Sequence, residues 1–188
     1  MKTENVLIDR DGHIKLVDFD LSKKFTVNKS NSNGESSTSD GDSIYNTEMN
    51  KIYDTTGTLQ YMAPEIILKK GHDTRADWWA LGIFMYELAT GEPPYMEIKS
   101  PNKLAFAICT KGYKLPNYFT RDFSDLLQRL TDKSPNKRIG SKGGSAEIKA
   151  HPFFSSITNW DDVARRGLTP PIVPANIVAK FKSKSGKF

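Results

Sequence analysis

The sequence predicts a mainly α-helical domain that carries one small β-hairpin near its amino-terminal end. Two short apolar runs with an Asp-Gly turn signal between them predict the hairpin. One long apolar stretch and two shorter amphipathic stretches predict the helices. With 188 residues, 37% of them hydrophobic, the chain is long enough for one domain with a core.

The hairpin is expected over residues 6–8 and 14–16, because both runs are apolar and Asp11-Gly12 lies between them. Residues 26–50 follow, and they are rich in Ser, Asn, Gly and Asp. Such a composition offers little apolar surface to bury, so this segment is expected to be a flexible insert.

The first helix is expected within residues 73–90, which are apolar on nearly every side between Trp78 and Leu88. A helix of that kind is expected to be buried on all sides. Two more helices are expected over residues 102–110 and 121–130. The second has apolar residues spaced by three, four and seven positions, which is the pattern of one buried helix face.

The composition excludes several classes of protein. The net charge of +5 is moderate, and the basic cluster near the end favours a solvated tail over nucleic-acid binding. The single cysteine, Cys109, cannot form an internal disulfide. No apolar run approaches the ~20 residues that span a membrane, and no signal peptide follows Met1. We therefore expect no membrane or nucleic-acid partner and a cytoplasmic location, with the nucleus as the alternative.

Asn5 and Asp18 are oxygen-bearing side chains on either side of the hairpin, which can bring them to one point. Mg²⁺ prefers such oxygens, shared with phosphates of a substrate. By itself Asp18-Phe19-Asp20 is a weak signal, and turn capping explains it more often. Four further strings follow in order: Gly57-Thr58-Leu59-Gln60-Tyr61-Met62-Ala63-Pro64-Glu65, Asp77-Trp78-Trp79-Ala80-Leu81-Gly82, Lys137-Arg138-Ile139-Gly140 and His151-Pro152-Phe153-Phe154.

With these strings in this order, the chain resembles the carboxy-terminal lobe of an AGC-group serine/threonine protein kinase. The likeness is greatest to the branch of ribosomal-protein and mitogen- and stress-activated kinases. Residues 1–167 would be a truncated kinase domain, and residues 168–188 the start of the group's carboxy-terminal tail. The resemblance implies phosphoryl transfer from Mg-ATP to Ser or Thr of basic protein substrates, and ATP and Mg²⁺ as cofactors.

The resemblance also implies roles for individual residues. Lys2 would contact the transferred phosphate, and Asn5 and Asp18 would hold Mg²⁺. Thr58 would brace the catalytic loop. Three residues would be structural, with Glu65 pairing with Arg138 and Asp77 tying down the backbone of the catalytic loop.

Substrate selection would depend on acidic and apolar side chains. By resemblance, Glu4 and Glu87 would receive an arginine that precedes the phosphoacceptor, through charge-assisted pairing. The alternative is that both are merely exposed carboxylates. Leu59 and Met62 would form an apolar pocket for the residue after the phosphoacceptor.

The chain departs from the family pattern at three places. Asp20 stands where the family has a glycine, at a position whose backbone often needs conformations that glycine adopts most easily. Thr3 replaces a proline, which we expect to loosen the loop. Asp54 occupies the position of the activation-loop phosphosite, where its carboxylate would imitate a phosphate. Thr55 and Thr56 are the alternative phosphoacceptors, for an upstream activating kinase.

A glycine-rich loop, a strand lysine and the catalytic base aspartate are not present in the sequence given. Because phosphoryl transfer depends on clamping ATP from both sides, the chain alone is expected to be inactive. We also expect one flank of the Trp78-to-Leu88 helix to be uncovered. Two hypotheses remain open: the carboxy-terminal lobe of a kinase, or a non-catalytic pseudokinase fragment that binds proteins.

Overall fold

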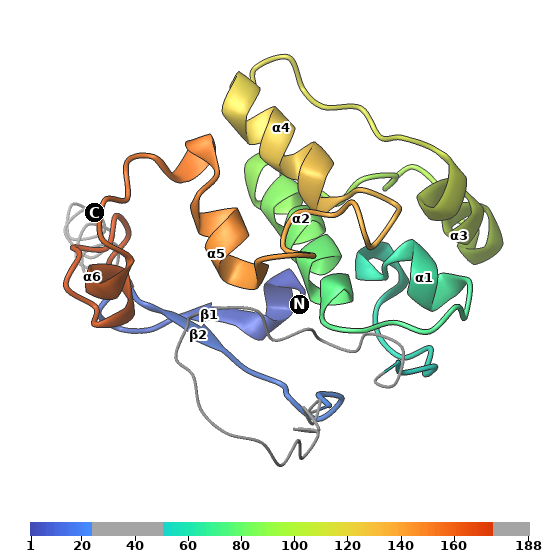
Figure 1. Ribbon diagram of the computed structural model, residues 1–188, viewed down its shortest axis with the longest axis horizontal. Helices are drawn as coiled ribbons and strands as arrows, with labels where there is room; N and C mark the ends of the chain where they lie inside the picture. The colour runs from blue at the N-terminus through green and yellow to red at the C-terminus, as the bar shows by residue number, and fades with distance from the viewer. Residues whose placement is uncertain (24–50, 175–188) are drawn as a thin grey trace, which may run out of the picture.

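A computed structural model describes residues 1–23 and 51–174, and Figure 1 shows how the elements are arranged. The predicted insert at 26–50 and the end of the predicted tail lie outside these residues. Two strands form the hairpin, β1 (Val6–Ile8) and β2 (Ile14–Leu16). The helices are α1 (Pro64–Ile67), α2 (Arg75–Thr90), α3 (Pro101–Thr110), α4 (Arg121–Leu130), α5 (Gly144–Lys149) and α6 (Trp160–Ala164). Short 3-10 helices cover Thr3–Asn5, Leu59–Tyr61 and Pro152–Phe154.

This architecture confirms the predicted fold class of mostly helix with one small hairpin. The three helices expected from the sequence are present as α2, α3 and α4, with bounds within two residues of the prediction. Among the described residues, no helix is both long and apolar enough to cross a membrane.

The hairpin is antiparallel, and Val6 pairs with Leu16, Leu7 with Lys15 and Ile8 with Ile14. The ladder continues beyond the strands, because the backbone N–H of Val17 donates to the carbonyl of Asn5 at 3.0 Å. At the other end, the Asp9 carboxylate accepts the backbone N–H groups of Asp11 and His13 and so closes the turn. This pairing fixes which residues stand opposite one another at the open end of the hairpin.

Helix α2 lies between two hydrophobic clusters, which explains its apolar sequence. Its residues Ala76, Trp79 and Ile83 are buried in the first cluster, together with Leu104 and Ile108 of α3. On another face, its residues Trp78, Leu81 and Met85 pack against the second cluster, which contains Leu126 and Leu130 of α4 and Ile148 of α5. The helix therefore links α3 in one cluster with α4 and α5 in the other.

Burial of α2 on all sides, however, was a wrong prediction. Leu88, in the last turn, is 65% exposed, and the adjacent Ala89 is exposed as well. The helix ends directly afterwards at Gly91, whose φ of 87° is left-handed and whose N–H donates to the carbonyl of Glu87. Of the flank expected to be uncovered between Trp78 and Leu88, only Leu88 is exposed.

Helix α4 packs closely on α2 because Gly82 has no side chain. A β-carbon at Gly82 would lie 2.7 Å from the methyl group of Thr131 and 2.9 Å from the β-carbon of Leu130. At its start, α4 is capped by the Thr120 side chain, which accepts the N–H of Phe123. Leu126, Leu127 and Leu130 are fully buried, as the apolar spacing of this helix predicts.

The first part of the predicted tail packs on the hairpin turn. Gly12 lies against Pro170 and Ile172, and Arg166 forms an ion pair with Asp9 at 3.3 Å. The two contacts join segments more than 150 positions apart and bring α6 beside the hairpin, as Figure 1 shows. The position of the turn is thus fixed from outside the hairpin.

Candidate functional site

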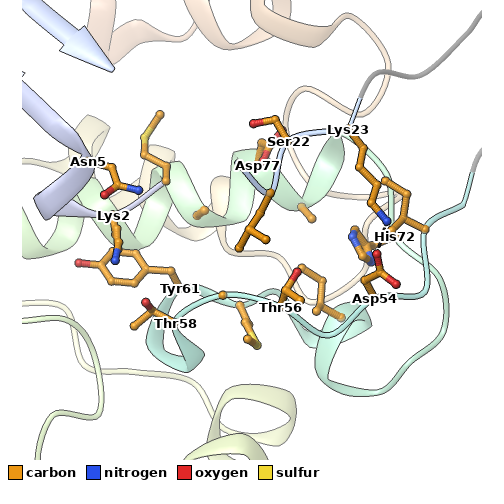
Figure 2. A pocket seen from close by; sticks show the side chains of 18 of the residues that line it. Lys2, Asn5, Ser22, Lys23, Asp54, Thr56, Thr58, Tyr61, His72 and Asp77 are labelled. Carbon is orange, nitrogen blue, oxygen red and sulfur yellow. Dashed lines mark hydrogen bonds and ion pairs between the residues drawn. The ribbon is translucent and has the colours of Figure 1, made fainter. Parts of the chain in front are cut away.

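A cleft of about 360 Å³ opens between the hairpin and the helices. Its walls come from the amino-terminal segment, from residues 21–23, from residues 52–66 and from the start of α2. Figure 2 shows Lys2, Tyr61 and Thr58 gathered at one end and Lys23, Asp54 and His72 at the other. Eight of the predicted site residues line this cleft: Lys2, Asn5, Asp18, Asp54, Thr56, Thr58, Met62 and Asp77.

The hairpin brings Asn5 and Asp18 together, as predicted. The Asn5 amide nitrogen donates to an Asp18 carboxylate oxygen at 2.9 Å. The cause is the backbone ladder, since Val17 bonds to the carbonyl of Asn5 and Asp18 is the next residue. Rotation of the Asn5 amide would turn its oxygen toward the same place, so the pair can present two hard oxygen ligands.

Asp18 has a φ of 64°, in the left-handed region that few residues other than glycine adopt. Aspartate tolerates this conformation better than most, and such backbone strain concentrates at functional sites. Asp20 is not among the described residues with a positive φ. The expectation that position 20 needs the freedom of glycine is therefore wrong here, and the strained residue of this motif is the predicted ligand.

The residues that could hold Mg²⁺ suit a site in which a bound nucleotide supplies further ligands better than a site formed by protein ligands alone. The described residues contain no group of three or more His, Cys, Asp or Glu side chains that could hold a metal. One carboxylate and one amide leave most positions of an octahedral ion to water and phosphate oxygens. This donor set is the one expected where a nucleotide supplies the other ligands.

Three further predicted residues face the cleft without side-chain hydrogen bonds to residues that the structure describes. Lys2 and Thr58 lie near each other at one end of it (Figure 2). Asp77 lies at the start of α2, and desolvation raises the pKa of its carboxyl group. The predicted tie between Asp77 and the catalytic-loop backbone is not among the described contacts, so that role stays a prediction.

The Glu87 carboxylate is held by two hydroxyl groups. Tyr61 donates to one of its oxygens, and the Thr3 hydroxyl lies 3.3 Å from the other. The Thr3 hydroxyl is also 3.3 Å from that of Tyr61. Desolvation, together with the bond to Glu87, raises the pKa of Tyr61. Glu4 follows Thr3 directly and is exposed.

Thr3 was expected to loosen the loop, but its contacts hold the loop in place. Its hydroxyl contacts α2, while the 3-10 turn that it begins is closed by its carbonyl, which accepts the N–H of Val6. Sequence reasoning overlooked both Thr3 and Tyr61 as site residues. The signal for Thr3 was its replacement of a proline, which has no group to donate.

Asp54 forms an ion pair with Lys23, across the rim of the cleft. The hydrogen bond from Lys23, with its positive charge, lowers the pKa of the Asp54 carboxyl group. Next to this pair, Ile52 and His72 exchange backbone hydrogen bonds of 2.9 Å in each direction. Thr55 and Thr56 are exposed. The sequence pattern gave no indication of Lys23, because lysine is common on surfaces.

Glu65 and Arg138 form the predicted pair, through two hydrogen bonds of 2.7 and 3.0 Å. Both side chains are buried, with 6% and 0% of their surface exposed. Arg138 also donates to the carbonyls of Arg75 and Asp132, and its guanidinium lies over the Trp79 ring. The pair therefore connects α1, the start of α2 and the segment after α4.

The two residues of the predicted apolar pocket are placed differently from each other. Met62 lines the cleft, and its methyl group is near Gly57. Leu59 packs against the first hydrophobic cluster instead, which includes Ala63. Only Met62 is thus a wall of the cleft, although both side chains are partly exposed.

Comparisons with known proteins agree with this architecture. The protein kinase domain family matches residues 1–154. The chain is 39% identical over 176 residues to the serine/threonine-protein kinase AtPK2/AtPK19 of Arabidopsis thaliana. The aligned residues make up 93% of this chain and 32% of that kinase. It is 35% identical over 176 residues to ribosomal protein S6 kinase 2 alpha of Gallus gallus, covering 93% of this chain and 20% of that kinase.

The chain is also 38% identical over 178 residues to protein kinase 3 of Dictyostelium discoideum, of which it covers 18%. It therefore spans a third or less of the length of these relatives. The family match covers most of this chain, and the predicted resemblance to AGC-type serine/threonine kinases is confirmed by relatives that include the ribosomal S6 kinases. The chain belongs to the protein kinase domain family.

Proposed function

We propose that this chain forms the magnesium and substrate-binding part of an ATP-dependent serine/threonine kinase. The observation that carries the proposal is the pair of oxygen-bearing side chains, Asn5 and Asp18, with a 2.9 Å contact at the cleft wall. When bound, Mg-ATP supplies the phosphoryl group that is transferred. Asn5 and Asp18 would hold the metal ion, and Lys2 beside them would attract a phosphate oxygen.

Protein substrates would dock where the Glu4 and Glu87 carboxylates lie, at the end of the cleft near Thr3. The Glu87 carboxylate contacts the Thr3 hydroxyl, and Glu4 is the next residue of the chain. Carboxylates attract basic side chains, and an arginine can pair with one of them bidentately. Substrates with basic residues before the phosphoacceptor therefore suit this surface. Met62 supports an apolar contact on the wall of the same cleft.

Asp54 would take the part of an activating phosphate, because its carboxylate already forms an ion pair with Lys23. A carboxylate has less charge than a phosphate, so this contact would be weaker than the one that it replaces. Thr55 and Thr56 are exposed and stay candidate sites for an upstream activating kinase.

A manganese titration followed by nuclear magnetic resonance tests the metal site. Mn²⁺ substitutes for Mg²⁺ at oxygen ligands, and its unpaired electrons broaden the signals of nearby amides. The amides of Asn5 and Asp18 are expected to broaden first when MnCl₂ and ATP are added to the full chain. Asp18→Asn should abolish this selective broadening.

The matched control is Asp20→Asn, which makes the same change two residues away, at a side chain that is not a predicted ligand. It should leave the broadening at Asn5 and Asp18 unchanged. Broadening centred elsewhere, or equal loss in both variants, would contradict the proposed site. Transfer of labelled phosphate to a serine peptide, lost in Asp18→Asn, would separate a catalytic role from binding alone.

A further inference from the structure

The Glu87 carboxylate, in the next-to-last turn of α2, accepts contacts from two different segments. Thr3 comes from the amino-terminal turn, and Tyr61 comes from the 3-10 helix that precedes α1. Figure 1 shows the amino-terminal turn beside α2, in agreement with these contacts. The carboxylate is thus fixed by residues 26 and 84 positions away, and not by its own helix.

The hydroxyl protons of Thr3 and Tyr61 orient the Glu87 carboxylate. Each hydroxyl has one proton to donate. When Thr3 donates to Oε1 and Tyr61 donates to Oε2, no proton is left for the 3.3 Å contact between the two hydroxyl oxygens. A carboxylate oxygen can accept more than one hydrogen bond. Both oxygens therefore keep acceptor capacity for a ligand, while the plane of the group is defined from two sides.

We propose that Thr3 determines the specificity of this surface, because its hydroxyl and that of Tyr61 hold the Glu87 carboxylate in the orientation that an arginine side chain requires. This inference rests on the proposed substrate-docking role of Glu87. A guanidinium is a planar fork that pairs with both oxygens of a fixed carboxylate, whereas a lysine ammonium is a point charge without that demand. A fixed carboxylate plane therefore favours arginine over lysine.

The chemistry of position 3 makes Thr3 suitable for this task. Its β-branched side chain has few rotamers, so the hydroxyl stays directed at Glu87 once the turn has formed. Serine would keep the donor but not the stiffness. Valine has nearly the same shape without the hydroxyl, and it isolates the effect of the hydrogen bond.

Two peptides that differ only in arginine or lysine before a serine provide the test, with binding to the full chain followed by fluorescence anisotropy. The wild-type chain is expected to prefer the arginine peptide. Thr3→Val should lower the affinity for this peptide about fivefold, as expected for one net hydrogen bond, and should change the affinity for the lysine peptide less than twofold. Thr3→Ser should retain most of the preference.

An equal loss for both peptides in Thr3→Val would overturn the inference, because that result indicates a general structural role. An unchanged ratio of affinities would overturn it as well. If the wild-type chain binds the two peptides equally well, the inference fails while the docking of basic substrates stands. If Glu87→Gln has no effect on the binding of either peptide, the docking role of Glu87 fails too. The manganese titration separates these cases, since Thr3→Val should leave the metal site at Asn5 and Asp18 intact.

Discussion

Of the ion pairs that join distant segments in the described part of the chain, two have very different surroundings. Glu65 and Arg138 pair in the helical body with at most 6% of either side chain exposed. Lys23 and Asp54 pair at the rim of the cleft, where about half of each side chain is exposed, 51% and 54%. Water can solvate a charged side chain that loses its partner at the rim of the cleft, but it cannot do so for the buried pair between the helices.

Similar contacts therefore serve different purposes in the two regions. In the body, a missing partner leaves a charge without solvent, so the pair must be complete for the fold to be stable. At the rim, the pair can break and form at little cost, as the proposed regulatory role of Asp54 would require.

The largest effect is expected for Arg138→Met. The substitution leaves the buried Glu65 carboxylate unpaired, and it removes the donors to the carbonyls of Arg75 and Asp132. The free energy of unfolding should fall by about 3–5 kcal/mol, measured by urea denaturation. A double variant, with Glu65→Leu added, should be less destabilised than the single one, because no charge is then left buried. If the double variant is worse, the unpaired charge is not the main cause.

An intermediate effect is expected for Gly12→Ala, at the contact between the hairpin turn and the tail. Gly12 has a φ of 94°, and an added β-carbon would lie 2.3 Å from the carbonyl oxygen of Ile172. The strain should lower the free energy of unfolding by about 1–3 kcal/mol. Displacement of the tail should also speed tryptic cleavage after Arg166.

Gly112→Ala is the matched control for this substitution. A β-carbon at Gly112 would meet no atom within 4 Å, and no positive φ constrains the position. Stability should stay the same or rise by about 0.4–1 kcal/mol, because alanine restricts the unfolded chain. Equal losses in the two variants would show that the contact with Ile172 has no special importance.

The smallest effect on stability is expected for Lys23→Gln, which breaks the exposed pair. The unfolding midpoint at pH 7 should not change measurably, since exposed ion pairs contribute little. The pKa of Asp54 should rise toward its ordinary value of 3.8, because Lys23 is the main cause of its lowering. Carbon-13 chemical shifts of the Asp54 carboxyl group, recorded between pH 6 and 2, measure this change.

The sign of the pH dependence follows from the direction of this shift. A carboxyl group with a lowered pKa in the folded state contributes its stability above its ordinary pKa of 3.8 and loses that contribution as the pH falls through the lowered value. The wild-type chain should therefore lose the Lys23–Asp54 contact only in acid. A pKa of Asp54 that is equal in the two proteins would show that the pair does not form in solution.

The sequence indicated much of the fold because its signals are local. Apolar spacing gave α4 with its bounds, and the Asp-Gly turn gave the hairpin. Exposure of Leu88 could not be predicted from the composition of α2, because it depends on which segments pack against the last turn. The order of the motifs indicated the family, and with it the pairing of Glu65 with Arg138.

The amino-acid sequence was enough to predict the kinds of elements, the family, and the chemical types of the side chains at the cleft. Which residues meet became visible only in the folded chain: Thr3 and Tyr61 at Glu87, Lys23 at Asp54, and Gly12 against residues 170 and 172. The cause is the separation along the chain over which each kind of signal acts. Periodicity and turn chemistry act over a few residues, whereas these contacts join segments between 26 and about 160 positions apart, whose approach depends on packing of the whole chain.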